Sequence, residues 1–509
     1  MMKHIDSFLN KTTMYKLVLY YCSFLIVVAF GLSIFHLVPF SPFALLFSTL
    51  FIVGISWLIH QIAAWAFSAP TNLESPYITA LILVLLITPP ATPTDRNYLW
   101  LAIWASVWAI SSKFLFAIKK KHVFNPAAFG VAMTALTLNL AASWWVGTAV
   151  MLPFVIGTGW LIVRKIRRAD LVWAFLGAAT VATIIIAIIN GHAIPTTLQF
   201  FFLNTPIFFF AFAMLTEPLT TSPTRNSRIA YGGLVGALFN PAISFGPIAL
   251  TPELALLVGN VLSYALSPKQ KLILKLNRIE TVADQTFDFV FDTDQQAKFT
   301  AGQYCEWTLP HEKPDMRGNR RYFTLASSPT EKEVRMGVKY YPKPSSFKQE
   351  LQTMKSGDVM IASQVSGDFV LPVDQSKKLV FIAGGIGVTP FRSMIKFMTD
   401  AGQKRDVVLM YSNKTEQEIA YRDVFAEAEK AYGLKTIYTL SDKAALSANW
   451  KGKIGMIDEA MIRETIPDFA DRMFYLSGPH GMVVAFEALL YKIGVPRRHI
   501  KTDYFPGFA

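Results

Sequence analysis

The sequence predicts a polytopic α-helical membrane domain of about ten spans, built as a five-plus-five inverted repeat, followed by an antiparallel β-barrel and a doubly wound α/β domain. Two observations predict it. The chain of 509 residues is 52% hydrophobic and only 16% charged, and its long apolar runs all lie before residue 268. Beyond that residue the pattern changes to short strand-like runs. The predicted domains are therefore 1–268, 269–374 and 375–509.

Ten apolar runs of membrane-spanning length account for the first domain. They begin near Tyr15, Ala44, Tyr77, Tyr98, Asn125, Gly147, Leu171, Thr197, Ala230 and Glu253. Because no small-residue cleavage site follows the first run, we interpret it as a retained helix rather than a signal peptide.

The basic residues of the first domain predict its orientation. Fourteen Lys and Arg residues precede residue 268, and threading the chain alternately through a bilayer places all but Arg96 on the side of the N-terminus. The positive-inside rule makes this side cytoplasmic, and an even number of spans places the later domains there too. We expect an integral protein of a bacterial-type plasma membrane, whose net charge of +13 reflects topology and contact with anionic lipid rather than a nucleic-acid surface.

The residues present limit the possible redox centres. Cys22 and Cys305 are the only cysteines, so the chain cannot supply a disulfide framework or the ligands of an iron–sulfur cluster. The histidines before residue 268 do not form facing pairs, which disfavours haem. The span interiors contain almost no ionisable residues, so a path of buried carboxylates for ions is not expected. We predict no metal site, and a flavin or a quinone as the carrier within the membrane.

Two pairs of phrases recur within the first domain. LLITPPATPTDR resembles MLTEPLTTSPTR, and FNPAAFG resembles FNPAISFG, with the two members of each pair threaded to opposite faces. Proline-interrupted segments at matching positions of an inverted repeat usually line a site between its halves. Chance recurrence of short proline phrases is the alternative. The predicted membrane site consists of Thr88, Asn125, Pro126, Thr216, Glu217, Asn240 and Pro241.

These phrases, with the third span that ends in PP, resemble the RnfD/NqrB family of membrane proteins, which belong to the Rnf complex and to the sodium-pumping NADH:quinone oxidoreductase. The resemblance covers about residues 15–267 and implies a five-plus-five inverted architecture that handles flavins. In that family an FMN is often esterified to a threonine in a Ser/Thr-Gly-Ala-Thr phrase. The corresponding loop here reads WWVGTAVMLP, so a second, non-covalent flavin (FMN or riboflavin), or none, is expected in this domain.

The rest of the chain changes period twice. FDFVFD, QYCEWTLP, VRMGVKYY and DVMIASQV alternate like strands of an antiparallel barrel. After residue 372, the runs KLVFIAGG, DVVLMYS, LKTIYTL and RMFYLSGP are strand-like, and helical stretches such as TPFRSMIKFMTDAG fall between them. Strands that alternate with helices predict a parallel, doubly wound sheet.

One strand of the barrel carries groups that suit a flavin. In NRRYFTLASSP, alternation sends Arg321 and Phe323 to one face of the strand and Tyr322 and Thr324 to the other. A guanidinium suits a pyrophosphate, an aromatic face suits a flavin, and a short hydroxyl can reach a flavin nitrogen. A solvated sheet edge is the alternative interpretation of such a strand.

The predicted α/β domain, residues 375–509, carries a nucleotide loop. In AGGIGVTP, Gly384, Gly385 and Gly387 let the backbone approach phosphates, and Thr389 and Pro390 open a helix whose N-terminus favours negative charge. The strand in FYLSGPHGM ends in Ser-Gly-Pro at the carboxyl edge of the same sheet, where ligands bind in doubly wound folds.

These motifs in this order, with FPGF near the end, resemble the ferredoxin–NADP⁺ reductase family of FAD enzymes over about residues 272–509. For FAD, the resemblance implies a flavin strand with Arg321, Tyr322, Phe323 and Thr324, and a pyrophosphate loop with Ser345 and Ser346. For the nicotinamide nucleotide, it implies a loop formed by Gly384, Gly385, Gly387, Thr389 and Pro390, and a segment at the nicotinamide ring formed by Ser477, Gly478 and Pro479. It also implies that Phe508 belongs to the cofactor site. Thr324 and Ser477 are its candidate catalytic residues.

Two departures from the family pattern affect the expected chemistry. Phe323 stands where tyrosine is commoner, which removes a hydroxyl near the flavin, and Ser477 stands where many members have cysteine. The choice between NADH and NADPH depends on Asn413, Lys414 and Arg422, where the adenosine end is expected. A cation there can hold a 2′-phosphate, but no clustered Ser/Arg pair is present, which favours NADH.

Joining the halves predicts a membrane-bound enzyme that passes electrons from NAD(P)H through FAD to a membrane site, where the acceptor is a quinone. Three alternatives stay open. In the first, electrons cross the membrane through a second flavin to an outside acceptor. In the second, the membrane half is a solute transporter or channel gated by the reductase. In the third, the chain is a haem-based ferric or oxygen reductase. Ion pumping, oligomeric state and associated proteins are not predicted.

Overall fold

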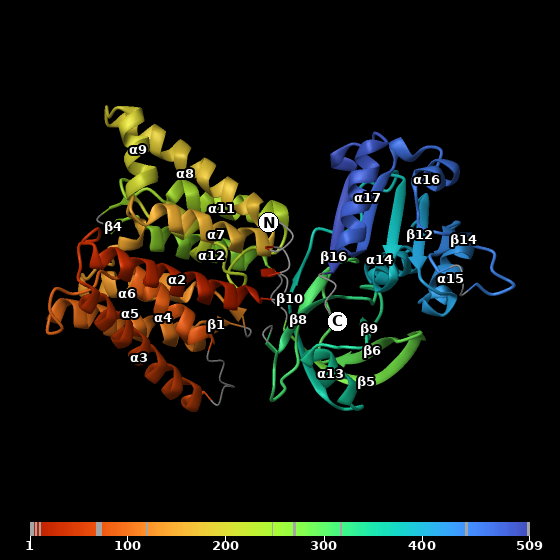
Figure 1. Cartoon of the computed structure of the whole chain (residues 1–509), viewed down its shortest axis with the longest axis horizontal. Helices are drawn as coiled ribbons and strands as arrows, with labels where there is room; N and C mark the ends of the chain where they lie inside the picture. The colour runs from red at the N-terminus through yellow and green to blue at the C-terminus, as the bar shows by residue number, and fades with distance from the viewer. Residues whose placement is uncertain are drawn as a thin grey trace. The chain divides into compact units, whose positions relative to one another are not determined.

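The computed structural model describes residues 5, 8–9, 12–67, 74–118, 121–246, 248–267, 271–315, 318–442 and 446–505. The chain divides into two compact units, residues 1–269 and 270–509. We call the first the helical unit and the second, after the family that its motifs resemble, the reductase unit, and we describe each by itself (Figure 1).

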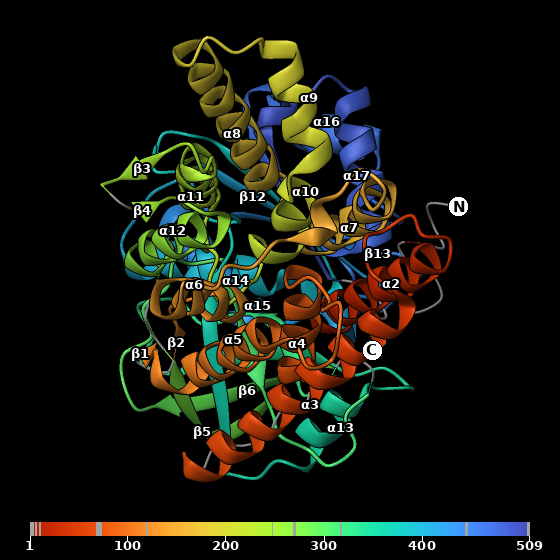
Figure 2. The same ribbon diagram turned by 90° about the vertical axis from the view of Figure 1, so that its left-hand side faces the viewer.

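The helical unit consists of two groups of helices that lie side by side (Figure 2). The first group is α2 (Met14–Ile34), α3 (Pro42–Ala66), α4 (Glu74–Leu86), α5 (Arg96–Leu115) and α6 (Pro126–Leu138). The second is α7 (Leu152–Ile166), α8 (Ala169–Ile189), α9 (Ile194–Asn204), α10 (Ile207–Phe209), the π-helical turn η2 (Phe210–Met214), α11 (Arg225–Leu238) and α12 (Pro252–Leu266). The turn η1 (Trp145–Gly147) and two pairs of short strands, β1 (Ala117–Ile118) with β2 (Lys121–His122) and β3 (Ser244–Phe245) with β4 (Ile248–Ala249), lie in the connections.

Helices begin within five residues of each predicted start, but most are shorter than a full span. Among the described residues, four helices are long and apolar enough to cross a membrane, and a fifth span results if the bent pair Ile194–Asn204 and Ile207–Met214 is counted as one. The apolar helices α4, α6 and α12 have only 13 to 15 residues. The structure therefore supports four or five spans by length and composition, and the number ten stays a prediction.

Local sequence explains where these helices begin and how they pack. Thr13, Ser41, Asp95, Asn125 and Thr251 each cap a helix with a side-chain oxygen that accepts a backbone N–H. Glycines allow close approach: a Cβ at Gly130 of α6 would lie 2.4 Å from the carbonyl oxygen of Ala105, and one at Gly236 of α11 would lie 2.3 Å from that of Phe175. Across the two groups, α2 contacts α7 and α6 contacts α12.

The reductase unit begins with a curled antiparallel sheet of six strands in the order β8-β7-β10-β5-β6-β9. Its elements are β5 (Leu272–Ala283), β6 (Thr286–Thr293), β7 (Tyr304–Thr308), β8 (Arg320–Thr324), β9 (Val334–Lys339), α13 (Ser346–Thr353) and β10 (Val359–Ser366). The edges approach each other just beyond β8, where the Ala326 N–H donates a hydrogen bond of 2.9 Å to the Arg335 carbonyl. A core around Trp307, Phe289 and Phe291 fills the inside of the curl.

A second, parallel sheet of six strands follows in the order β14-β13-β12-β11-β15-β16. Its elements are β11 (Leu379–Gly384), η3 (Gly385–Val388), α14 (Thr389–Asp400), β12 (Val407–Asn413), η4 (Glu416–Glu418), α15 (Arg422–Tyr432), β13 (Lys435–Leu440), β14 (Lys453–Ile454), α16 (Glu459–Thr465), η6 (Phe469–Asp471), β15 (Met473–Pro479), α17 (His480–Lys492), η7 (Arg497–His499) and β16 (Ile500–Phe505).

Alternation along β11 shows that both faces of this sheet are covered. Phe381 belongs to the core shared with α14 and α15, whereas Ile382 belongs to the core shared with α16 and α17. The strand order reverses between β11 and β15, which pair in parallel. In doubly wound sheets the ligand crevice lies outside the carboxyl ends of the strands at this reversal. The glycine loop after β11 and the Ser-Gly-Pro end of β15 both lie there.

Candidate functional site

Strand β8 presents the predicted flavin residues in the alternation expected of a strand. The Arg321 guanidinium lies 5.4 Å from the centre of the Phe347 ring, and the Phe323 ring packs on the same ring at 5.8 Å, so both side chains share one face. Arg321 also pairs with Asp315, because its Nη2 atom donates to both carboxylate oxygens at 2.8 Å. Tyr322 is on the exposed side and donates to Glu306.

The two serines of the predicted pyrophosphate loop both support the start of α13. The Ser345 hydroxyl accepts the Lys348 N–H as the N-cap. The Ser346 hydroxyl accepts the Asp315 N–H at 2.9 Å and lies 3.1 Å from Nε2 of His311. Because Asp315 also pairs with Arg321, these contacts fix the position of this loop relative to the flavin strand.

The end of β8 is tied directly to the helix that follows the nucleotide loop. Arg392 on α14 donates to the Ala326 carbonyl at 2.9 Å, and the neighbouring Ser393 hydroxyl donates to the Ser327 carbonyl at 2.6 Å. Ala326 lies two residues after Thr324, and Arg392 lies three residues after the first residue of α14. The flavin strand and the nucleotide loop therefore meet at one junction within the reductase unit.

The positions of the nucleotide loop occupied by glycine favour this residue for different structural reasons. Gly385 has φ +52°, in the left-handed region, and a Cβ there would meet nothing within 4 Å, so the loop is open on that side. A Cβ at Gly387 would lie 2.5 Å from the Ser477 carbonyl oxygen, so only glycine lets η3 pass the end of β15. Thr389 and Pro390 begin α14, as predicted.

Within the part of the chain that the structure describes, two buried hydroxyls at this junction have no hydrogen-bond partner. They belong to Thr324, which is 3% exposed, and to Ser477, which is fully buried opposite Ala383 in the sheet register. Buried polar groups usually pair with protein groups, water or a ligand, so these two hydroxyls are available to a bound group. With the open glycine loop, these hydroxyls fit a bound flavin and nicotinamide. Phe508, the remaining predicted cofactor residue, lies outside the described residues.

A buried polar pair beside the junction joins the two sheets. Tyr421, at φ +59°, donates its hydroxyl to Oδ1 of Asp288 on β6. Burial raises the pKa of Asp288, and the hydrogen bond from Tyr421 and the charges of Arg392 and Arg335 act in the opposite direction. The Arg392 guanidinium also lies over the Tyr421 ring at 5.8 Å. Sequence reasoning missed this pair, although a tyrosine directly before a helix and an aspartate among apolar strand residues are visible signals.

Beyond β12, the residues expected at the adenosine end form a charged cluster. Arg422 donates to a carboxylate oxygen of Glu416 at 3.2 Å and lies over the Tyr438 ring at 5.6 Å. The Ser447 hydroxyl also donates to Glu416, and this hydrogen bond lowers the pKa of the carboxyl. Asn413 is buried at the end of the strand. Glu416 was not predicted; it is an acidic residue soon after the second strand of the sheet.

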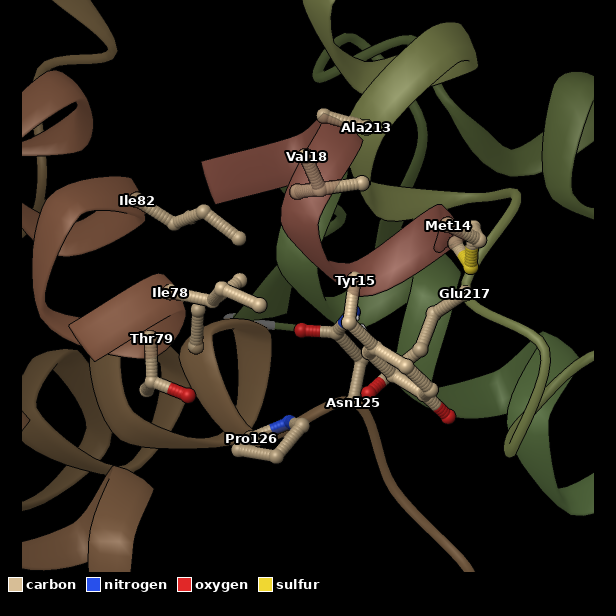
Figure 3. Close-up of a pocket in the computed structure, with 11 residues that line it drawn as sticks. Met14, Tyr15, Val18, Ile78, Thr79, Ile82, Asn125, Pro126, Ala213 and Glu217 are labelled. Carbon is tan, nitrogen blue, oxygen red and sulfur yellow. Dashed lines mark hydrogen bonds between the residues drawn. The ribbon is translucent and has the colours of Figure 1, made fainter. Parts of the chain in front are cut away.

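The helical unit contains a small cavity that is partly open to solvent. It is lined by Met14, Tyr15, Val18, Ile78, Thr79, Ile82, Asn125, Pro126, Ala127, Ala213 and Glu217. Figure 3 shows the aliphatic side chains of Val18, Ile78 and Ile82 on one side and the polar groups of Asn125 and Glu217 across from them. Its walls come from α2 and α4, from the start of α6, and from η2 with the loop after it.

Hydrogen bonds fix the polar side of the cavity. Asn125 Nδ2 donates to Oε2 of Glu217 at 2.9 Å, and the Asn125 N–H donates to Oδ1 of Asn260 on α12 at 2.8 Å. Asn260 in turn donates to the Tyr231 hydroxyl on α11 at 3.1 Å. Asn260 and Tyr231 were missed by sequence reasoning; an asparagine on the buried face of an apolar helix was the available signal.

The structure gathers only part of the predicted membrane site. Asn125, Pro126 and Glu217 line the cavity, and Thr216, buried next to Glu217, donates to the Phe212 carbonyl. Three members lie elsewhere: Thr88 is exposed and bonds Ser143, Asn240 donates to Thr183, and Pro241 is exposed. The physical reason is local, because Asn125 caps a helix, whereas a turn and the strands β3 and β4 follow Asn240 and the next helix starts only at Pro252.

Comparisons with known proteins concern the reductase unit. Residues 381–487 match the family model of the oxidoreductase NAD-binding domain. The chain is 30% identical to a flavohemoprotein of Candida albicans over 211 residues, which cover 40% of this chain and 50% of the relative. It is 26% identical to the xylene/toluene monooxygenase electron transfer component XylA of Pseudomonas putida over 276 residues, covering 54% of this chain and 76% of the relative. The chain spans about half the length of the flavohemoproteins it matches.

Solved structures that are similar include the cytochrome P450 reductase GcoB of Amycolatopsis, with 23% identity and a TM-score of 0.42 over 46% of this chain and 70% of that one. The FAD/NAD-binding domain of a nitric oxide dioxygenase from Vibrio cholerae has 21% identity and a TM-score of 0.41 over 46% of this chain and 98% of that one. The family match and the curated relatives identify the C-terminal part as a flavin oxidoreductase module. It transfers electrons, and its cofactors are FAD and NAD(P)H.

Proposed function

We propose that the chain is a membrane-bound NAD(P)H oxidoreductase whose reductase unit supplies electrons to an acceptor in the cavity of the helical unit, and that this acceptor is a quinone. The observation that carries the proposal is the cavity, which combines an aliphatic wall with a hydrogen-bonded polar side. Ligand sites are usually lined mostly by apolar groups, with a few polar groups that orient the ligand. A quinone has this chemistry, an apolar body with two carbonyl oxygens.

Exposed apolar side chains support a bilayer around the helical unit. On α3, Leu50 is 66% exposed and Trp65 is 83% exposed; on α2, Val27 is 69% exposed. Helices that are apolar on their outer face as well as their inner face are typical of membrane spans. The proposed location of the reductase unit on the cytoplasmic side of the membrane rests on the distribution of basic residues.

Within the reductase unit, the proposed roles follow the contacts of each residue. Arg321, oriented by Asp315, would hold the FAD pyrophosphate, and the unpaired Thr324 hydroxyl would face the flavin. The glycine loop would hold the nicotinamide nucleotide, and Ser477 would orient its ring. The chemistry that bound FAD supplies is acceptance of a hydride from NAD(P)H and release of the electrons one at a time.

The test separates the two units. The full chain, purified in mild detergent, is assayed with NADH and either ferricyanide, which takes electrons at the reductase unit, or a short-chain ubiquinone. Val18→Trp, which fills the cavity, should abolish quinone reduction and leave ferricyanide reduction unchanged. Val27→Trp, on the exposed face of the same helix, is the matched control and should leave both rates unchanged. Equal quinone reduction in the two variants would contradict the proposal.

Flavin content distinguishes the remaining alternative. Extraction and an absorption spectrum of the wild-type protein should give FAD alone if the cavity binds quinone directly. A second flavin of the FMN or riboflavin type would instead favour electron delivery through the helical unit to another acceptor.

A further inference from the structure

The cavity holds one acid in an oriented position. Among the described residues that line it, Glu217 is the one carboxylic acid. Its Oε2 accepts hydrogen bonds from Asn125 Nδ2 at 2.9 Å and from the Thr220 hydroxyl at 3.0 Å. Its carbonyl accepts the Thr221 N–H at 3.1 Å, which fixes the backbone of the loop. Among the described residues, the hydrogen bonds that hold the carboxyl group are both to Oε2.

We propose that Glu217 donates a proton to the quinone reduced in this cavity, an inference that rests on the proposed function. Reduction of a quinone to a quinol consumes two electrons and two protons, and each carbonyl oxygen gains one O–H bond. NAD(P)H supplies both electrons and one proton, and solvent supplies the other. In the step assigned to Glu217, its O–H bond breaks, an O–H bond forms on one quinone oxygen, and the carboxylate is reprotonated from solvent.

The aliphatic part of the cavity wall limits the groups that can supply a proton to a bound quinone. Val18, Ile78 and Ile82 carry no hydrogen-bonding groups, and the hydroxyl of Thr79 beside Ile78 accepts a hydrogen bond from Lys113 (Figure 3). A positioned side-chain acid accelerates such proton transfers by roughly 10²–10⁴-fold. Asn125, which is held by Asn260 and Met214, keeps the acid in place rather than taking part in the transfer.

Other titratable groups surround this end of the cavity. Within the described residues they are Tyr15 on α2, Lys113 on α5, Tyr231 on α11 and Arg168 before α8. Lys113 donates to the hydroxyl of Thr79 at 2.7 Å, and Thr79 lines the cavity. When protonated, Lys113 would stabilise the negative charge that remains on Glu217 after the proton leaves.

Glu217→Gln tests the proposal with the purified full chain, NADH and a short-chain ubiquinone. We expect the kcat for quinone to fall by about 10²-fold or more, with little change in its KM, because the amide keeps the size of the side chain but carries no acidic proton. The wild-type rate should decline on the alkaline side of its pH profile, and this decline should be absent from the variant. Glu217→Asp should restore part of the rate. Ferricyanide reduction should be unchanged throughout.

The matched control is Glu253→Gln, which changes another buried carboxylate of the helical unit. Glu253 accepts a hydrogen bond from Trp144 Nε1 at 3.1 Å and does not line the cavity. This variant should keep both the quinone rate and the pH profile of the wild type. If it lost quinone reduction to the same extent as Glu217→Gln, the effect would be general to buried acids and the assignment would be wrong.

Three further results separate the inference from the proposed function. A Glu217→Gln variant with wild-type quinone kinetics and an intact alkaline decline would overturn the inference and leave the proposed function standing. A wild-type protein that reduces ferricyanide but no quinone would overturn both. If Glu217→Gln fails to assemble, Thr220→Val replaces it: the carboxylate loses one donor, so the alkaline decline should move to higher pH, and an unmoved profile would contradict the inference.

Discussion

The side chains of Asn125 and Glu217 meet in a hydrogen bond of 2.9 Å, although 92 residues separate them and they belong to different halves of the helical unit. The bond joins the cap of α6 to the loop after η2. One phrase from each recurring pair, FNPAAFG in the first half and MLTEPLTTSPTR in the second, therefore contributes to one site.

Asn125→Ala should impair this site without affecting the reductase unit. The substitution removes a hydrogen-bond donor to a buried carboxylate, which costs about 1–3 kcal/mol of stability. It also removes the cap of α6, which costs about 1 kcal/mol. Quinone reduction should fall, and ferricyanide reduction should stay at the wild-type rate. Asn240→Ala, in the second FNP phrase, is the control, because Asn240 bonds Thr183 away from the cavity. A parallel loss of both rates in Asn125→Ala would refute the division of labour between the units.

Thr324→Val should slow hydride transfer without lowering stability. The hydroxyl it removes is buried and unpaired, so an isosteric methyl group should leave the thermal midpoint of the cofactor-free protein unchanged or higher. The turnover with NADH and ferricyanide should fall by roughly ten- to a hundredfold if the hydroxyl acts on the flavin.

Thr436→Val on β13 is the control for this change, because its buried hydroxyl is also unpaired but lies away from the junction. It should have normal turnover. Ser477→Ala should behave as Thr324→Val does. Normal turnover in both Thr324→Val and Ser477→Ala would remove these residues from the proposed mechanism.

Glu416 should make the enzyme prefer NADH. A carboxylate near the end of the second strand accepts the ribose hydroxyls of NADH and repels the 2′-phosphate of NADPH. Glu416→Gln releases Arg422, so the KM for NADPH should fall by roughly tenfold, as expected for one charge-assisted hydrogen bond, and the KM for NADH should rise. Glu427→Gln, an exposed partner of Lys396, is the control. An unchanged ratio of the two KM values would show that the ribose lies elsewhere.

The reductase unit was predictable because its signals are local. Strands with a period of two, such as β6 and β12, and the glycine loop before α14 follow directly from the order of residues. The short edge strand β14 and the last strand β16 were missed, since two residues and a mixed polar run carry no clear period. In the helical unit, Asn125 and Glu217 were identified by repetition. Asn260 and Lys113 were missed because each is a single polar residue whose role depends on tertiary contacts.

The Tyr421–Asp288 hydrogen bond should stabilise the reductase unit in a pH-dependent way. Burial raises the pKa of Asp288 in the folded protein above its pKa in the unfolded chain. The free energy of unfolding therefore falls as the pH rises from the pKa of the unfolded state through that of the folded state. The hydrogen bond from Tyr421 opposes that shift. Tyr421→Phe therefore raises the pKa of Asp288 further, and the loss of stability should be larger at pH 7.5 than at pH 5, where more of the carboxyl is protonated.

The measurement is the rate of thermal inactivation of NADH-dependent ferricyanide reduction at the two pH values. Loss of the donor to a buried carboxylate should cost about 1–3 kcal/mol at pH 7.5. Tyr432→Phe, at the end of the helix that follows Tyr421, removes a hydroxyl with no hydrogen-bond partner among the described residues and should have no such effect. A destabilisation of Tyr421→Phe that is equal at both pH values would mean that the hydroxyl stabilises the junction through packing and not through the charge of Asp288.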